Sequence, residues 1–132
     1  MKPTIYALNW APDFAKGQVR DLRVRWALEE AGIDYQANCM SFSEKAQHDY
    51  LARQPFGQVP AYEDEEVQLF ESGAIVLHIA EKSDALMPTD PAGKARARMW
   101  LIAALSSIEP FIFPYQDIIL FNGMVLITMG VH

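Results

Sequence analysis

The first 40 residues alternate between two hydrophobic periods, and this alternation limits the folds that the chain can adopt. Residues 4–9 contain the apolar run Ile-Tyr-Ala-Leu of a short buried strand, and a Pro-Asp break follows. Residues 18–31 have helical spacing and end at Gly32, which is a typical helix stop. An apolar stripe runs along this helix at Val19, Leu22, Trp26 and Ala27. Residues 34–40 alternate like a half-buried strand. Strand, helix and strand in this order predict a right-handed parallel unit.

The remaining pattern predicts a hairpin and three further helices. These are a short polar helix from Ser43 to Pro55, a hairpin of residues 59–62 and 67–70, a helix over residues 74–82 that Ser72 caps, and a helix from Asp90 to Pro110. The last helix has an apolar stripe at Ala95, Met99, Ile102 and Leu105, with Trp100 adjacent. No other predicted element covers this stripe. The order is β-α-β-α-β-β-α followed by one more helix, which is an α/β fold.

Composition narrows the functional classes. Hydrophobic residues make up 51% of the 132-residue chain, which is typical of a globular protein. The net charge of −6 argues against a nucleic-acid partner, since phosphate backbones repel acidic proteins. The single cysteine, Cys39, forms neither an internal disulfide nor a tetrahedral zinc site, so no metal site is predicted. The lack of disulfide-forming cysteine pairs is typical of proteins in a reducing compartment, so we expect the protein in the cytoplasm.

Charge is unevenly distributed along the chain. Of the 28 charged residues, 27 lie within residues 1–109, and Asp117 is the only one after them. The largely apolar tail is interrupted by Pro114, Gln116, Asp117 and Asn122, which argues against a membrane-spanning helix. We therefore expect no membrane partner, and we interpret the tail as a segment that has lost a neighbouring domain or was never part of an intact fold.

The residues that carry chemistry lie in the segment 54–82. Pro60 stands where a strand begins, and a cis Val59-Pro60 bond would expose the preceding backbone to a ligand. Ser72 stands where a strand meets a helix, so free N–H groups and the positive end of the helix dipole suit a carboxylate. Glu71 beside it suits an ammonium group. Together these residues fit a short peptide with a free amino-acid head.

Four segments resemble the glutathione transferase family, of a bacterial type: RVRWALEEAGIDY, PFGQVPAYED, LFESGAIVLHIAEK and MPTDPAGKARARMW. The resemblance covers residues 4–110. It implies a thioredoxin-like glutathione-binding domain over residues 1–83. Residues 84–132 would be a linker and the truncated start of an all-helical domain with an atypical apolar tail.

The resemblance also implies roles for individual residues. The Val59 backbone, before cis-Pro60, would pair with the cysteinyl part of glutathione. Glu71 and Ser72 would hold the γ-glutamyl head, and Gln58 would lie near the glycyl end. Glutathione would be a co-substrate without any further cofactor. The expected partners are a small apolar electrophile and a second copy of the chain, as a homodimer or through self-association.

The catalytic position departs from the family pattern. The family usually places Tyr, Ser or Cys after the first strand or at the start of the first helix, and this chain has none of them, nor Thr, between Ala7 and Asp34. Asn9 is the leading candidate to stabilise the glutathione thiolate, Arg20 is next, and Tyr6 is weaker. The predicted function is conjugation of glutathione to small electrophiles. The alternatives are a glutathione-binding module without turnover and an inactive transferase fragment.

Overall fold

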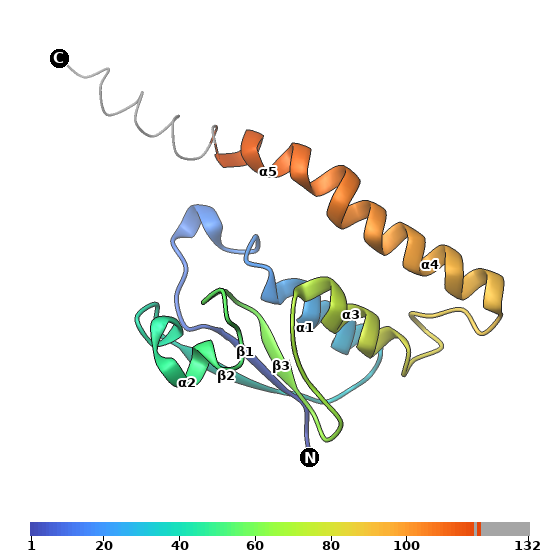
Figure 1. Cartoon of the computed structure of the whole chain (residues 1–132), viewed down its shortest axis with the longest axis horizontal. Coiled ribbons are helices and arrows are strands. Elements are labelled where there is room, and N and C mark those ends of the chain that lie inside the picture. Colours follow the sequence, from blue (N-terminus) through green and yellow to red (C-terminus); the bar gives the residue numbers. More distant parts are fainter. Residues whose placement is uncertain (118, 120–132) are drawn as a thin grey trace.

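Four strands form one mixed sheet in the computed structural model, which describes residues 1–117 and 119. The strands are β1 (Thr4–Leu8), β2 (Gln36–Met40), β3 (Ala61–Glu63) and β4 (Gln68–Phe70). Their order across the sheet is β2-β1-β3-β4. β2 runs parallel to β1, whereas β3 is antiparallel to both β1 and β4 (Figure 1). The predicted parallel unit and the predicted hairpin are both confirmed.

Helices cover both faces of this sheet. They are α1 (Asp21–Glu30), α2 (His48–Leu51), α3 (Ser72–Ala80), α4 (Pro91–Ala103) and α5 (Glu109–Asp117), with short turns η1 (Asp13–Ala15) and η2 (Glu44–Ala46) and the π-helical segment η3 (Ala104–Ile108). Successive residues of β1 point to opposite faces, as the strand period requires. Ile5 joins a core with residues of α1, α3 and β3, whereas Tyr6 packs with Tyr50 of α2. The arrangement is the expected α/β, thioredoxin-like order followed by a further helix.

The inner face of α1 is not the one predicted. The helix buries Val24, Ala27 and Leu28 against the sheet, whereas Leu22 and Trp26 of the predicted stripe are exposed. Both stripes have helical spacing and similar hydrophobicity, so periodicity alone does not decide between them. The exposed stripe faces the helices that follow the sheet.

Three other boundaries differ from the prediction. β2 begins at Gln36 and is exposed except at Met40, because it is an edge strand. The polar segment before Pro55 divides into η2 and the four-residue α2. At α3 the N-cap residue is Glu71, and Ser72 is the first helical residue. Ser72 is thus not the cap that the sequence predicts.

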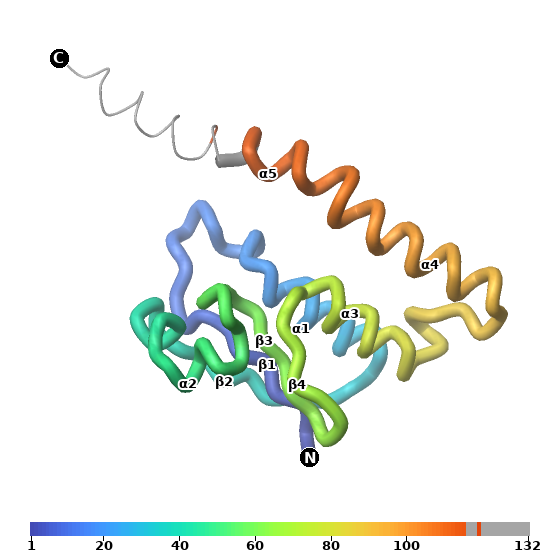
Figure 2. The backbone as a smooth tube through the Cα atoms, in the orientation of Figure 1, coloured from blue at the N-terminus to red at the C-terminus, as the bar shows by residue number. Residues whose placement is uncertain are grey.

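Beyond the sheet, α4, η3 and α5 follow one another as a single helical arm over α1 and α3 (Figures 1 and 2). Asp90 caps the arm as predicted, because its carboxylate accepts a hydrogen bond from the Gly93 N–H at 2.7 Å. The predicted end at Pro110 is wrong, since the helix continues to Asp117. Pro110 lacks a donor, and the π-helical segment just before it changes the hydrogen-bond register.

The arm is apolar on more than one face. The predicted stripe residues Met99 and Ile102 are exposed, while Leu101 and Leu105 turn toward α1 and α3. Within the described range 1–117 and 119, no helix combines the length and hydrophobicity needed to cross a bilayer. The predicted apolar tail lies mostly outside the described residues.

Candidate functional site

Strand register brings together the two motifs that the sequence singles out. Ala61 of β3 pairs with Phe70 of β4. Pro60 directly precedes the first residue of this pair and Glu71 directly follows the second, so the two motifs begin next to the last pair of the ladder. The Val59-Pro60 bond is cis, as predicted. Two segments separated by an acidic hairpin therefore meet at one end of the sheet.

The C-terminal end of β1 lies at this same end of the sheet. Tyr6 pairs with Ala61, so the register places Ala7 opposite Pro60. Asn9 follows directly, and its backbone N–H donates to the Met40 carbonyl at 2.8 Å. The Asn9 side chain is exposed and lines a small cavity of about 220 Å³ at the start of α1. Ligands of open α/β sheets commonly bind at the carboxyl ends of the parallel strands, and Asn9 stands at such an end.

Gln58 and Val59, the two residues before Pro60, can offer backbone groups as well as side chains to a ligand. The Gln58 side chain is exposed, and its carbonyl accepts a hydrogen bond from the Tyr50 hydroxyl at 2.5 Å. Burial, together with the neighbouring Tyr6, raises the pKa of Tyr50 to about 12, so the hydroxyl remains a donor at neutral pH. This bond fixes the loop just before Pro60, which is itself buried.

Glu71 adopts a backbone conformation that non-glycine residues rarely occupy. Its φ is +72° and its ψ is 111°, and its side chain is exposed. Such positive-φ residues cost on the order of 1–3 kcal/mol and cluster at functional sites. The strained turn sets an exposed carboxylate at the N-terminus of α3.

Ser72 is buried and belongs to a charged cluster. The Arg23 guanidinium donates to the Ser72 hydroxyl oxygen at 3.3 Å. The same guanidinium donates to both carboxylate oxygens of Glu109, at 2.9 and 3.2 Å. Arg20 also pairs with Glu109, at 3.1 Å, and its guanidinium lies 4.7 Å from the centre of the Phe113 ring. Arg20 and Ser72, both predicted from the sequence, thus belong to one cluster that spans α1, α3 and the arm.

Glu109 and Arg23 are residues that the sequence does not single out. Arg23 lies in the RVRWAL segment, and Glu109 is the last charged residue before the largely uncharged tail. The Arg23 hydrogen bonds, opposed by burial and supported by Arg20, hold the pKa of the Glu109 carboxyl below its ordinary value. The abrupt end of the charged part of the chain at Glu109 is the one sequence signal that points to it.

An apolar groove of about 860 Å³ runs beside this cluster, between α1, α3 and the arm. Val19, Leu22 and Trp26 line one wall, and Leu105 and Ile108 of the arm line the other. Ser72 and Gly73 stand at its edge, and a Cβ added at Gly73 would overlap the Leu105 side chain. Val19 and Leu22 also border the small cavity at Asn9, so the two cavities lie on either side of the start of α1.

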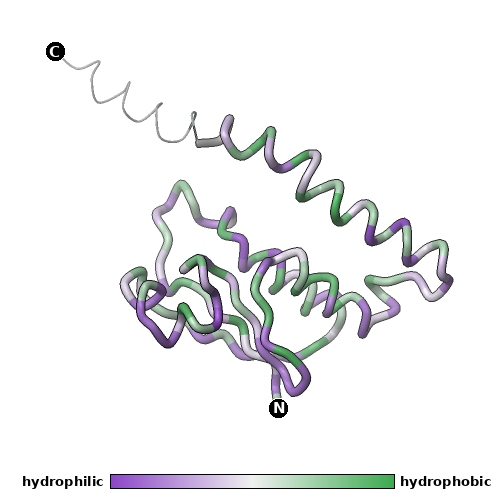
Figure 3. The backbone as a smooth tube through the Cα atoms, in the orientation of Figure 1, coloured by the Kyte–Doolittle hydropathy of each residue, from purple (hydrophilic) through white to green (hydrophobic). Residues whose placement is uncertain are grey.

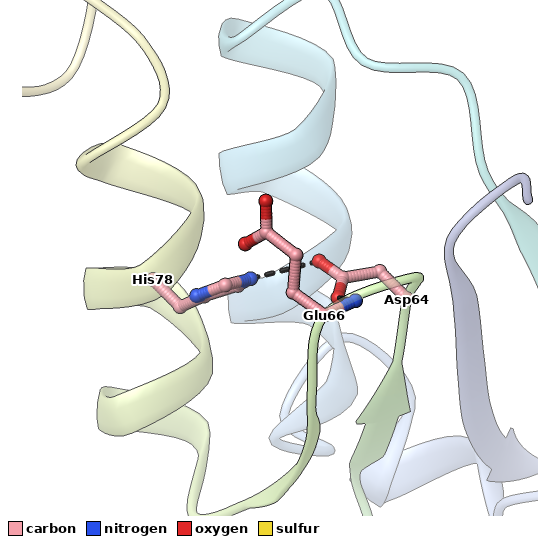
Figure 4. Close-up of side chains that lie close together, drawn as sticks. All are labelled: Asp64, Glu66 and His78. Atoms are coloured by element: carbon pink, nitrogen blue, oxygen red, sulfur yellow. Dashed lines mark hydrogen bonds and ion pairs between the residues drawn. The ribbon is translucent and has the colours of Figure 1, made fainter.

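A second polar cluster ties the hairpin to α3 (Figure 4). Asp64 accepts hydrogen bonds from Tyr62 at 3.0 Å and Lys82 at 3.0 Å, and its carboxylate lies 2.8 Å from Nε2 of His78. Candidate ligand atoms of Asp64, Glu66 and His78 lie within 4.8 Å of one another. The Lys82 ammonium already pairs with both carboxylates, which favours a structural tie over a cation site.

Comparisons with known proteins agree with the fold. The family described as glutathione S-transferase, N-terminal domain, matches residues 14–81, which is just over half of the chain. A mixed four-stranded sheet with a cis-proline before β3 and a helix after β4 is the architecture of a thioredoxin-like class of domain. The chain belongs to the glutathione S-transferase family.

The curated relatives match this chain over only part of their own length. Probable glutathione S-transferase GSTF2 of Oryza sativa subsp. japonica is 38% identical over 92 residues, which cover 66% of this chain and 42% of the relative. Glutathione S-transferase 4 of Zea mays is 47% identical over 62 residues, which cover 46% of this chain and 28% of the relative. The chain therefore spans less than half the length of these curated relatives. They are plant proteins, which does not agree with the bacterial type that the resemblance implied.

Solved structures extend the match into the arm. Poplar glutathione transferase F1 superposes with a TM-score of 0.76 at 30% identity, covering 92% of this chain and 56% of that one. A glutathione transferase homologue from Sulfitobacter, solved with bound glutathione, superposes with a TM-score of 0.63 at 32% identity, covering 80% of this chain and 49% of that one. The arm thus belongs to the shared fold and is not a separate addition.

Proposed function

We propose that this chain binds glutathione at the end of the sheet where β1, β3 and the N-terminus of α3 meet. The observation that carries the proposal is the pairing of Ala61 with Phe70, since cis-Pro60 directly precedes this pair and Glu71-Ser72 directly follows it. The Sulfitobacter homologue was solved with glutathione bound, which supports the same ligand for this chain. Residues 1–83 form the glutathione-binding unit in this proposal, and residues 84–132 form the linker and the helical part.

Each part of the peptide has a matching group. The γ-glutamyl carboxylate lies at the N-terminus of α3 and accepts from the Ser72 hydroxyl, while the ammonium group pairs with Glu71. The backbone of Val59 pairs with the cysteinyl residue, and Gln58 reaches the glycyl end. Glutathione is the co-substrate, and no further cofactor enters the proposal.

The reaction that we propose is attack of the glutathione thiolate on the electrophilic carbon of a small apolar substrate. A free thiol has a pKa of about 8.5, and lowering it by two units requires about 2.7 kcal/mol of thiolate stabilisation. A charge-assisted hydrogen bond from Asn9, with the N-terminus of α1 nearby, supplies stabilisation of that order. Arg20 is the second candidate, although Glu109 already engages its guanidinium. The apolar groove beside Ser72 offers a surface for the electrophile.

A second candidate function is glutathione binding without turnover. It is favoured by the absence of Ser, Thr, Tyr and Cys from residues 8–33, where the family usually places its thiolate-stabilising group. The third candidate is an inactive transferase fragment. We place the protein in the cytoplasm and expect it to associate with a second copy.

Titration calorimetry with glutathione tests the binding proposal. Ser72→Ala is expected to weaken binding by about 1–2 kcal/mol, or roughly five- to thirtyfold, because a hydrogen bond to a carboxylate is lost. Ser83→Ala, a serine variant beyond the end of α3, is expected to bind normally. Thermal unfolding of each variant separates binding from stability. An unchanged affinity in a folded Ser72→Ala variant contradicts the proposal.

A further inference from the structure

Gly73 is a helical glycine whose backbone conformation does not require one. It is buried as the second residue of α3, and its φ lies outside the left-handed region that favours glycine. Within a helix, alanine is more stable than glycine by about 1 kcal/mol. The reason for a glycine at this position therefore lies in the packing around it.

The Leu105 side chain fills the space that a side chain at position 73 would need. A Cβ on Gly73 would overlap Cδ1 of Leu105 and would lie 3.6 and 3.8 Å from its Cγ and Cδ2 atoms. Leu105 is half-buried and belongs to η3, the π-helical segment of the arm. Such segments often occur at functional sites. The arm thus contacts the backbone of α3 directly at Gly73.

This contact lies on the first turn of α3. The N–H groups of residues 72–74 precede the first hydrogen bond of the helix, which runs from the Ile75 N–H to the Glu71 carbonyl at 3.0 Å. The Glu71 side chain does not cap them. Leu105 also lines the apolar groove. Its side chain therefore stands between the groove and the turn that carries these donors.

We propose that Leu105 is a positioning residue, which closes the first turn of α3 on the side of the groove, and that Gly73 provides the space for it. A carboxylate bound at the N–H groups of this turn is then screened from water in the groove. Attraction between a charge and a helix N-terminus is stronger where water is excluded. This inference rests on the proposed function, because the carboxylate is the γ-glutamyl one of glutathione.

Gly73→Ala separates the packing contact from helix propensity. Propensity alone predicts a more stable protein, whereas overlap with Leu105 predicts a less stable one. We expect the free energy of unfolding in urea to fall. In calorimetry, glutathione is expected to bind roughly three- to tenfold more weakly, because displacement of Leu105 admits water to the turn. Leu105→Ala is expected to weaken binding by a similar factor for the same reason.

The double variant Gly73→Ala/Leu105→Ala provides the sharpest measurement. Loss of the Leu105 δ carbons makes room for the new methyl group on α3, and that methyl group covers part of the turn. We expect the double variant to bind glutathione more tightly than either single variant. Independent effects would instead multiply the two losses, and a double variant that binds more weakly than both single variants would overturn the inference.

Gly93→Ala is the matched control. Gly93 is also a buried glycine in the first turn of a helix, and a Cβ there would overlap Asp90 and Pro88 at the start of the arm. The variant tests whether crowding at any helix start lowers the affinity for glutathione. We expect lower stability and unchanged affinity, and an affinity loss equal to that of Gly73→Ala would contradict the proposal.

The ligand offers an independent arm of the experiment. The analogue γ-aminobutyryl-cysteinyl-glycine lacks the carboxylate that the turn is proposed to bind, so Leu105→Ala is expected not to alter its affinity. This comparison does not need Gly73→Ala and therefore remains decisive if that variant fails to fold. Equal losses for glutathione and for the analogue would overturn the inference, as would an unchanged glutathione affinity of Leu105→Ala. A folded Ser72→Ala variant with unchanged glutathione affinity would instead overturn the proposed function itself.

Discussion

Asn9 is the residue on which the proposed chemistry depends. Its amide is exposed at the end of β1, and no hydrogen bond connects that amide with another residue of the described chain. We expect Asn9→Ala to raise the pKa of the bound glutathione thiol by about one to two units, because the thiolate loses a charge-assisted hydrogen bond. Affinity for glutathione changes little. The ultraviolet absorbance of the thiolate, followed during a pH titration, measures the shift.

Asn38→Ala is the control for this titration. Asn38 is an exposed asparagine on the edge strand β2, and its replacement is expected to leave the thiol pKa unchanged. If Asn9→Ala also titrates like the unmodified protein, the thiolate is stabilised by Arg20 or by backbone donors.

Site residues that depend on local geometry are predictable from the sequence. Pro60 at a strand start and Glu71-Ser72 at a strand-to-helix junction are visible as short patterns, and hairpin register then brings them together. The Arg23–Glu109 pair is not visible in this way, since 86 positions separate its members. No local period encodes which charged side chain of the arm meets which arginine of α1.

At the scale of elements, the contact between the hairpin and α3 depends on Asp64. Burial raises the pKa of its carboxyl, but hydrogen bonds from His78, from the Glu66 and Val67 N–H groups and from Lys82 outweigh this effect. The pKa therefore lies well below its ordinary value. Stability from this group is fully present above the ordinary carboxyl pKa and is lost as the pH falls toward the lowered value.

We expect Asp64→Asn to lower the free energy of unfolding by about 1–3 kcal/mol at pH 7, because Tyr62, His78 and Lys82 lose a charged acceptor that is itself only 6% exposed. The variant should also lose less stability than the unmodified protein when the pH falls from neutral to about 3. Urea unfolding at both pH values measures this. Glu66→Gln removes a mostly exposed carboxylate of the same turn and is expected to cost less than about 0.5 kcal/mol. A similar effect of the two variants would argue against a stabilising role of the Asp64 contacts between the hairpin and α3.

Element order is better predicted than the face that each helix buries. The alternation of periods gives the strands and helices in their correct sequence. On α1, however, both apolar stripes have a packing role. Val24 and Leu28 pack on the sheet, while Leu22 and Trp26 line the groove. A helix that packs against two neighbours needs an apolar stripe for each of them. The sequence pattern does not show which stripe packs against which neighbour. The arm continues past Pro110, which lies in the first turn of α5, where a missing N–H donor is tolerated.

For the molecule as a whole, the dominant feature is apolar surface on the arm and in the groove. Hydrophobic residues recur along the arm between hydrophilic ones (Figure 3). Exposed large apolar side chains on the arm, and at the described residue Ile119 after it, are Met99, Trp100, Ile102, Ile108, Phe111, Ile112, Tyr115 and Ile119. A helix with apolar residues on more than one face normally packs against more than one neighbour. Extended apolar patches on soluble monomers are rare and mark interfaces or aggregation.

We therefore expect the 132-residue chain to self-associate, with transferase turnover far below that of the longer relatives. Glutathione affinity should survive, since the residues proposed to contact the peptide lie between Asn9 and Ser72. Sedimentation velocity over a concentration series measures the association, and a thiol-conjugation assay measures turnover. Trp26→Gln removes a groove side chain, and Trp10→Gln removes one outside the groove; both tryptophans are 67% exposed. If the groove or its rim drives association, only Trp26→Gln weakens it, by about tenfold, the scale of a partly buried aromatic side chain. A monodisperse monomer with ordinary turnover would contradict this expectation, and equal effects of the two variants would locate the association elsewhere on the surface.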